Sequence, residues 1–113
     1  MPFVKELPEK DFYAVIFSNT KSDNSEGYAE MDEKTMTLAA QQPGYLGYES
    51  LSSEKQTIFI SYWENKESID NWSKNAIHMT AKSNAHKWYT RYLSQICLVE
   101  RSRFFDLSPP KSQ

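Results

Sequence analysis

Two segments of this chain are apolar on both faces of an extended backbone, and they restrict the fold more than any other feature. Residues 12–18 read FYAVIFS and residues 56–63 read QTIFISYW. Side chains alternate between the two faces of a strand, so Ile60 and Tyr62 share one face while Phe59 lies on the other. Apolar character on both faces predicts strands that are covered on both sides.

A helix is predicted between these strands, over residues 27–42. Its apolar stripe recurs at helical spacing and consists of Tyr28, Met31, Thr35, Leu38 and Ala39. Asp23, Asn24 and Ser25 are candidate N-caps, and Pro43-Gly44 ends the helix because proline cannot continue it. Glu30, Asp32 and Glu33 are expected on the solvated face.

The rest of the chain supplies two more strands and a second helical region. Residues 45–51 predict a strand, and residues 52–55 connect it to the strand at 56–63. Asn65 is a plausible cap for helical sequence that continues to about residue 89, with a break near Lys74-Asn75. The last strand is expected at residues 92–104.

The predicted order is β-α-β-β-α-β, an α+β ferredoxin-like fold with a four-stranded antiparallel sheet and helices on one face. We expect an N-terminal extension at 1–11, the domain at 12–105 and a loose tail at 106–113. Helices on one face leave the second apolar face bare, which soluble monomers rarely tolerate beyond a few hundred Å². At about 25 cal/mol per Å², covering it could contribute on the order of 10 kcal/mol before association costs. A homodimer through the sheet faces is therefore expected.

Composition excludes several classes of function. The 113 residues carry a net charge of -2, and the 13 Lys and Arg are scattered, so we expect no nucleic-acid partner. No signal-like or membrane-spanning apolar run occurs, which favours a cytoplasmic protein without a membrane partner. Cys97 stands alone in an apolar run and is expected to be a buried thiol rather than part of a zinc site.

Several motifs resemble those of the antibiotic biosynthesis monooxygenase (ABM) superfamily. They are AVIFSNT at 14–20, QQPGYLGYES at 41–50, ISYWENKESIDNW at 60–72, His78, and KWYTRY at 87–92. The resemblance covers about residues 12–105. It implies a ferredoxin-like subunit that dimerises into an α+β barrel. The superfamily includes cofactor-independent quinone-forming oxygenases and haem-degrading enzymes.

The candidate site lies between the sheet and the second helical region. Trp72 and His78 are six residues apart, about 120° away from a shared face of an unbroken helix, but a break near Asn75 would bring them together. By resemblance, Trp72 holds the place of a pocket tryptophan in haem-degrading members; otherwise it is a core residue beside Ile69. His78 is either a general base or hydrogen-bond donor, or a partly exposed histidine without a chemical role. His86 is expected at the surface.

The resemblance also bears on the expected roles of Lys82, Ser18 and Asn19. Haem-degrading members carry their iron-ligating histidine ten residues after the pocket tryptophan, where this chain has Lys82, a poor iron ligand. The catalytic asparagine of the family falls at Ser18 or Asn19, and a one-residue shift changes the face of the strand. Asn19 would hydrogen-bond a substrate oxygen, or it simply begins a polar loop.

These observations predict a cofactor-independent monooxygenase of the ABM type that acts on a small aromatic molecule, such as a phenol or quinol. The candidate catalytic residues are His78, Trp72 and Asn19, and no metal is expected. The candidate substrate-binding walls, which are alternatively core or dimer contacts, are Tyr62, Trp63, Trp88 and Tyr89. One alternative is a haem-binding or haem-degrading monooxygenase, disfavoured by Lys82. Another is a non-catalytic dimer that binds a small ligand or acts under stress.

Overall fold

The computed structural model describes residues 6–109, except the side chains of Ala76 and Ile77. The first five residues of the expected N-terminal extension and the last four of the expected tail lie outside the described residues. No helix in the described part of the chain is long and apolar enough to span a lipid bilayer.

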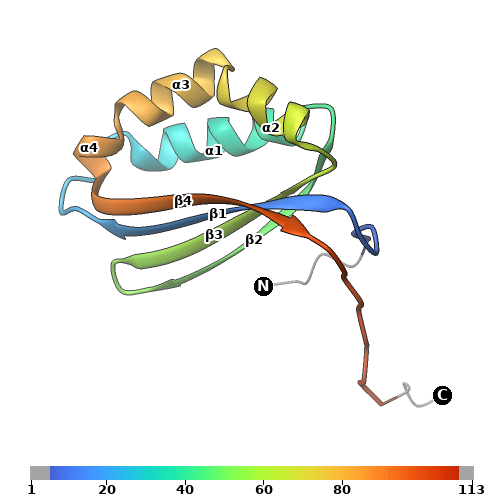
Figure 1. Ribbon diagram of the computed structural model, residues 1–113. Helices are drawn as coiled ribbons and strands as arrows, with labels where there is room; N and C mark the ends of the chain where they lie inside the picture. The colour runs from blue at the N-terminus through green and yellow to red at the C-terminus, as the bar shows by residue number, and fades with distance from the viewer. Residues whose placement is uncertain (1–5, 110–113) are drawn as a thin grey trace.

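Four antiparallel strands form one sheet in the order β2-β3-β1-β4. The strands are β1 (Phe12–Lys21), β2 (Tyr45–Ser53), β3 (Gln56–Trp63) and β4 (Tyr89–Val99). The helices are α1 (Tyr28–Ala39), α2 (Lys66–Ser73), α3 (Ala76–Ser83) and α4 (Ala85–Trp88). All four helices lie on the same side of the sheet (Figure 1). The ferredoxin-like α+β prediction is confirmed.

The second helical region is broken where the sequence predicts. The Asn65 side chain accepts a hydrogen bond from the backbone N–H of Ser68 at 2.8 Å and so caps α2. The backbone N–H of Asn75 bonds to the carbonyl of Trp72, three residues earlier, which tightens the last turn and ends α2. The chain then restarts as α3.

Several predicted boundaries and one predicted cap are wrong. The first strand extends past residue 18 to Lys21, so Asn19 lies inside β1 rather than in a loop. β4 begins at Tyr89, which pairs with Lys21, and it ends at Val99 instead of residue 104. α1 has no side-chain cap, because Gly27 precedes it in the left-handed conformation with φ 79°.

The apolar core on the helix side lies at one end of the sheet. Its buried cluster consists of Ala39, Trp63, Ile69 and Trp72. Tyr13, Val15, Leu38 and Tyr45 pack against that cluster. Because these contacts gather near the start of β1 and the end of β3, the space between the sheet and the helices is less tightly packed at the other end of the sheet.

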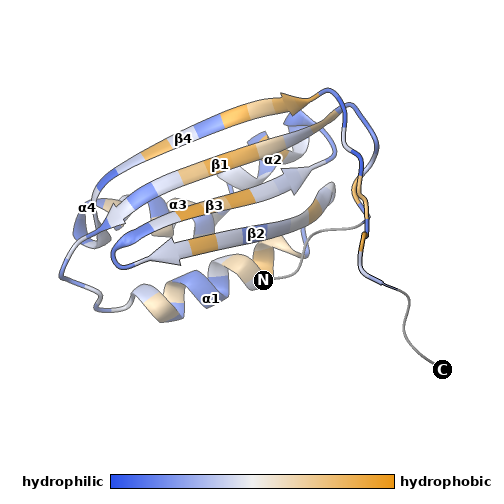
Figure 2. Cartoon of the chain, turned by 90° about the horizontal axis from the view of Figure 1, so that it is seen from below, coloured by the Kyte–Doolittle hydropathy of each residue, from blue (hydrophilic) through white to orange (hydrophobic). Residues whose placement is uncertain are grey.

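The opposite face of the sheet, here called the open face, carries no helix (Figure 2). Leu51, Ile58 and Leu93 form a row across it and are 69%, 52% and 56% exposed. Ile16 and Ile60 form a half-buried pair in the next row. The predicted bare apolar face is therefore present. Cys97, expected to be buried, is half-buried.

Two glycines provide a matched test of how α2 is seated. Gly44 has φ 85°, and a Cβ there would collide with Ser68, the first buried residue of α2, meeting its Cβ at 2.7 Å. Gly27 has φ 79°, but a Cβ there would meet Trp88 at an ordinary 3.9 Å.

We expect Gly27→Ala to lower the free energy of unfolding by about 1–2 kcal/mol, the cost of a left-handed alanine. Gly44→Ala should cost about 2–5 kcal/mol, because overpacking adds roughly 1–3 kcal/mol to the same backbone cost. Urea unfolding of both variants measures the difference. Equal losses would mean that α2 is not held by this close approach.

Candidate functional site

A cavity of about 660 Å³ lies between the sheet and the helices. Its floor includes Val15 and Phe17 on β1 and Phe59 on β3, and α1 and α3 form its roof. Its outer side is bounded by the edge strand β4, where Tyr92 and Ile96 remain more than half exposed. A volume of this size is typical of small-molecule sites.

Trp72 and His78 meet at one end of this cavity. Their ring centroids are 4.9 Å apart, with an interplanar angle of 87°. The break after α2 allows this contact, as the sequence predicts. Trp72 is 6% exposed and belongs to the core cluster while it also lines the cavity, so the two interpretations of this residue are compatible.

His78 is held in its neutral form. Burial lowers its pKa to about 4, and the positive charge of Lys82 acts in the same direction. At pH 7 the imidazole is therefore uncharged and a weak base. Its buried Nδ1 has no hydrogen-bond partner among the described residues. His78 is suited to hydrogen-bonding a ligand rather than to removing a proton from a phenol.

Asn19 lies on the helix side of β1, opposite Thr57 on β3 and Tyr92 on β4. It is 8% exposed and lines the cavity, whereas Ser18 points to the open face. Of the two positions that the sequence left open, Asn19 is the one that faces the cavity. Its Oδ1 is buried without a hydrogen-bond partner in the described structure.

Thr35 on α1 supplies a third buried polar atom without a partner among the described residues. The three residues Asn19, Thr35 and His78 come from β1, α1 and α3, yet all line the same cavity. An unsatisfied buried polar group costs roughly 1–3 kcal/mol, so such groups are rare unless they serve a ligand or an ordered water.

A cluster of titratable groups lies at the Asn19 end of the cavity. The Tyr89 hydroxyl hydrogen-bonds the Tyr28 hydroxyl at 3.5 Å, and Lys21 Nζ lies 4.6 Å from the Tyr28 ring centroid. Partial burial raises the pKa of the Asp32 carboxyl, and the charge of Lys21 opposes this rise.

Asp32 is exposed, as predicted for the solvated face of α1. It also lines the cavity, which the sequence analysis did not predict. The signal was in the sequence, because Asp32 stands four residues after Tyr28 and three before Thr35. It therefore falls on the same helical stripe as two residues that were assigned to the interior.

Three of the four predicted aromatic walls line the cavity: Trp63, Trp88 and Tyr89. Tyr62 does not, because it lies on the open face, where its hydroxyl donates to Glu49 at 2.5 Å. Its assignment as a substrate wall of this cavity is wrong. His86 is exposed, as expected.

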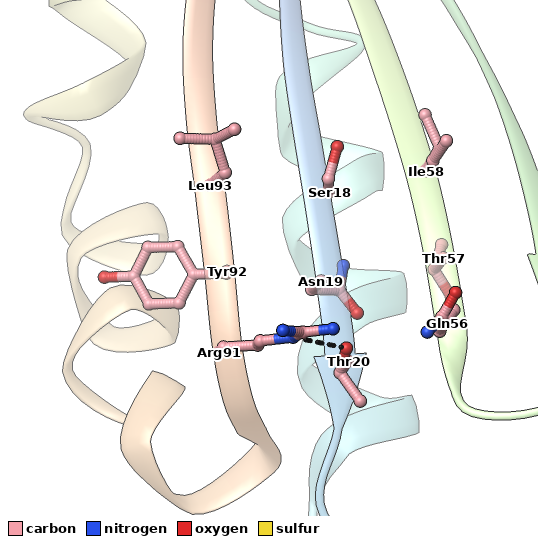
Figure 3. A pocket seen from close by; sticks show the side chains of 9 residues that line it. All are labelled: Ser18, Asn19, Thr20, Gln56, Thr57, Ile58, Arg91, Tyr92 and Leu93. Carbon is pink, nitrogen blue, oxygen red and sulfur yellow. Dashed lines mark hydrogen bonds between the residues drawn. The ribbon is translucent and has the colours of Figure 1, made fainter.

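The open face has a second, shallower pocket of about 340 Å³ at the end of the sheet where Asn19 lies (Figure 3). Ser18, Thr20 and Arg91 line it, and Arg91 Nε donates to the Thr20 hydroxyl at 3.3 Å. Within residues 6–109, no three His, Cys, Asp or Glu residues gather into a group that could hold a metal ion.

The lowered pKa of His78 predicts a pH-dependent stability. Between about pH 4 and 6.5 the unfolded chain binds a proton that the native chain does not, so the free energy of unfolding should fall as the pH drops through this window. His78→Gln should remove this slope in urea unfolding. Lys82→Gln should raise the pKa of His78, measured by NMR titration. A native-state pKa at the ordinary value would contradict the burial of the ring.

Comparisons with known proteins agree with this architecture. A family model described as "Antibiotic biosynthesis monooxygenase" matches residues 11–84. The "Uncharacterized protein YqjZ" of Bacillus subtilis (strain 168) is 40% identical over 107 residues, which is 93% of this chain and 94% of that protein.

Two solved structures share the fold at low sequence identity. SnoaB from Streptomyces nogalater, described as a cofactor-independent oxygenase, has a TM-score of 0.70 and 12% identity, covering 81% of this chain and 96% of its own. SO0527 from Shewanella oneidensis has a TM-score of 0.71 and 8% identity, covering 82% and 95%.

Proposed function

Because the chain belongs to the antibiotic biosynthesis monooxygenase family, we propose that it is a monooxygenase that oxidises a small phenol or quinol in the cavity between its sheet and helices. The observation that carries this proposal is the convergence of three unpartnered buried polar atoms, on Asn19, Thr35 and His78, into one aromatic-lined space. A flat ligand with hydroxyl groups at its rim can satisfy such a site, because a hydroxyl donates to the Asn19 oxygen and can also accept.

The cavity favours a ligand with more than one ring. Val15 packs against the core cluster that contains Trp72, the partner of His78, whereas Asn19 stands four residues further along β1. At about 3.3 Å per residue, those two levels of the strand are roughly 13 Å apart. A cavity that extends between these two levels matches a planar fused-ring molecule that carries oxygens at opposite ends.

The proposed reaction needs no metal or organic cofactor, and SnoaB is likewise described as cofactor-independent. A phenolate is electron-rich enough to transfer an electron to dioxygen directly. One oxygen atom of O₂ enters the ring and becomes a quinone oxygen, and the other leaves as water. The substrate supplies all the electrons, so the protein has only to bind, orient and ionise it.

The charge of Lys82, which lines the cavity, favours that ionisation beside His78. The ammonium group of Lys82 lies close enough to His78 to lower the pKa of the imidazole, so it also stabilises a phenolate oxygen beside that ring. Neutral His78, with its proton on the nitrogen that faces the ligand, donates a hydrogen bond to the same oxygen, and Asn19 binds the far end. The phenol binds as its anion, and its proton is released to solvent.

We expect oxygen uptake in the presence of electron-rich phenols or quinols, and a loss of roughly tenfold or more with Lys82→Gln. An adjacent opposite charge lowers a pKa by about 1–3 units, and this stabilisation is lost with the ammonium. Lys82→Arg keeps the charge and should keep most of the activity. Lys74→Gln, at an exposed position that does not line the cavity, is the control. An oxygen electrode measures the rates.

Binding of 4-nitrophenol separates ligand binding from turnover, because its phenolate absorbs visible light and the neutral phenol does not. The wild-type protein should increase the ionised fraction at a pH below the probe's own pKa, and Lys82→Gln should not. Thermal stabilisation by phenols without any oxygen uptake would contradict the proposed enzyme activity and favour a non-catalytic ligand-binding protein. A stoichiometric Soret shift on adding haemin would favour a haem protein instead.

We propose further that the protein is a homodimer whose subunits pack through their open faces. The row formed by Leu51, Ile58 and Leu93 leaves three large apolar side chains exposed on one continuous surface. Face-to-face packing of two sheets at about 10 Å would cover the same row on both subunits.

Ile58 and Met79 offer a matched pair for testing this dimer, since they are 52% and 56% exposed on opposite sides of the subunit. Ile58→Asp should weaken dimerisation by roughly a hundredfold or more, because an unpaired charge would be buried in the interface. Met79→Asp, on α3, should leave it unchanged. Sedimentation equilibrium measures both. A wild-type monomer, or equal behaviour of the two variants, would refute the interface.

A further inference from the structure

Two exposed apolar surfaces would remain after the open faces pair. One is a strip on the helix side of β4, formed by Tyr92, Ile96 and Leu98, which are 56%, 51% and 52% exposed. The other is the C-terminal segment at residues 103–109, here called the arm, in which Phe105 and Leu107 are 71% and 88% exposed. Sheet pairing covers neither of them, because the strip faces away from the open face and the arm lies beyond the sheet.

The root of the arm is fixed to the body of the subunit. The backbone N–H of Asp11 donates to the carbonyl of Val99 at 3.0 Å, and that of Ser102 donates to the carbonyl of Glu9 at 2.6 Å. Beyond this point the chain descends on the open-face side of the sheet, away from the helices (Figure 1). Seen from below, it runs beyond the end of its own sheet rather than across it (Figure 2).

We infer that each arm packs on the β4 strip of a second copy of this chain, with Phe105 and Leu107 as its apolar contacts. This inference rests on the proposed dimer. The arm cannot reach the strip of its own subunit by continuing in the same direction, because that strip lies on the opposite side of the sheet. A partner subunit paired with the open face would lie on the side of the sheet to which the arm points.

The length of the arm suits this role. Seven extended residues, 103–109, span about 23 Å at roughly 3.3 Å per residue. Paired sheets are separated by about 10 Å, so the arm can cross that gap and continue past the edge of the partner's sheet. β4 is an edge strand of the sheet, so no other strand of the described structure stands between its strip and an arriving segment.

The small area of the open face is a second reason to expect that the arm contributes to the dimer interface. Four strands about 4.8 Å apart and on average about 31 Å long present a flat area of roughly 600 Å². Stable interfaces of standard size bury about 800 Å² per partner. A buried aromatic side chain contributes about 150–250 Å², so an arm carrying Phe105 and Leu107 supplies much of the difference.

The docked arm would also complete the ligand site. Tyr92 and Ile96 of the strip line the cavity at its outer side, where no helix covers them. An arm from the second copy lying on these side chains would cover that side and exclude water from the cavity. The partner would thus contribute to the site of each subunit.

Photo-cross-linking tests the contact directly in the full chain. Asp106 lies between the two apolar contacts and is replaced by p-benzoylphenylalanine. Irradiation should give a product of twice the subunit mass. Trypsin cleaves after Arg91, Arg101 and Arg103, so the product should join the arm peptide 104–111 to peptide 92–101, which contains the entire strip.

The double variant Phe105→Ser/Leu107→Ser should raise the dimer dissociation constant at least tenfold. The matched control, Arg103→Ser/Ser108→Ala, should leave it unchanged. A dimer in sedimentation that cross-links only within its own chain, or to any other peptide, or not at all, would overturn the arm contact and leave the proposed dimer intact. A monomeric wild-type chain would overturn both.

Discussion

The structure depends on a sheet whose two faces are both apolar. Helices cover one face, but only part of it tightly, because the cluster of Ala39, Trp63, Ile69 and Trp72 fills one end of the layer. The remaining space is the 660 Å³ cavity. The other face has no helix at all (Figure 2). Ligand site and proposed subunit interface therefore have the same origin, since both are apolar surfaces that one subunit does not fill.

Much of the fold follows from local patterns. β3 has the predicted bounds, and the break between α2 and α3 falls where the apolar spacing is interrupted. The errors occur where distant contacts override local signals. The helical spacing continues through Tyr89, but pairing with Lys21 draws Tyr89 into β4. The polar run before α1 suggests a side-chain cap, whereas Asn24 instead accepts a hydrogen bond from the N–H of Glu26 and Gly27 makes the turn.

The candidate site was predictable only in part. The contact between Trp72 and His78 follows from the helix break, and Asn19 was one of two possible positions. Whether the other predicted strand residues line the cavity depends on the face that each occupies, because a shift of one residue places a side chain on the opposite face of the sheet. Tyr62, for example, stands next to Trp63 in β3 but on the opposite face of the sheet, away from the cavity. The unpartnered oxygen of Thr35 and the shifted pKa values of His78 and Asp32 depend on three-dimensional packing, which no local pattern encodes.

Lys82 connects the electrostatics of the cavity to its chemistry. Its ammonium group and burial together keep His78 uncharged, so the pocket already holds one positive charge beside a ring that resists gaining another. A metal cation coordinated by His78 would add a second positive charge at that point. A phenolate would instead balance the charge and hydrogen-bond the imidazole at the same time. In the proposed site, Lys82 would therefore favour an organic anion beside His78 over a metal cation.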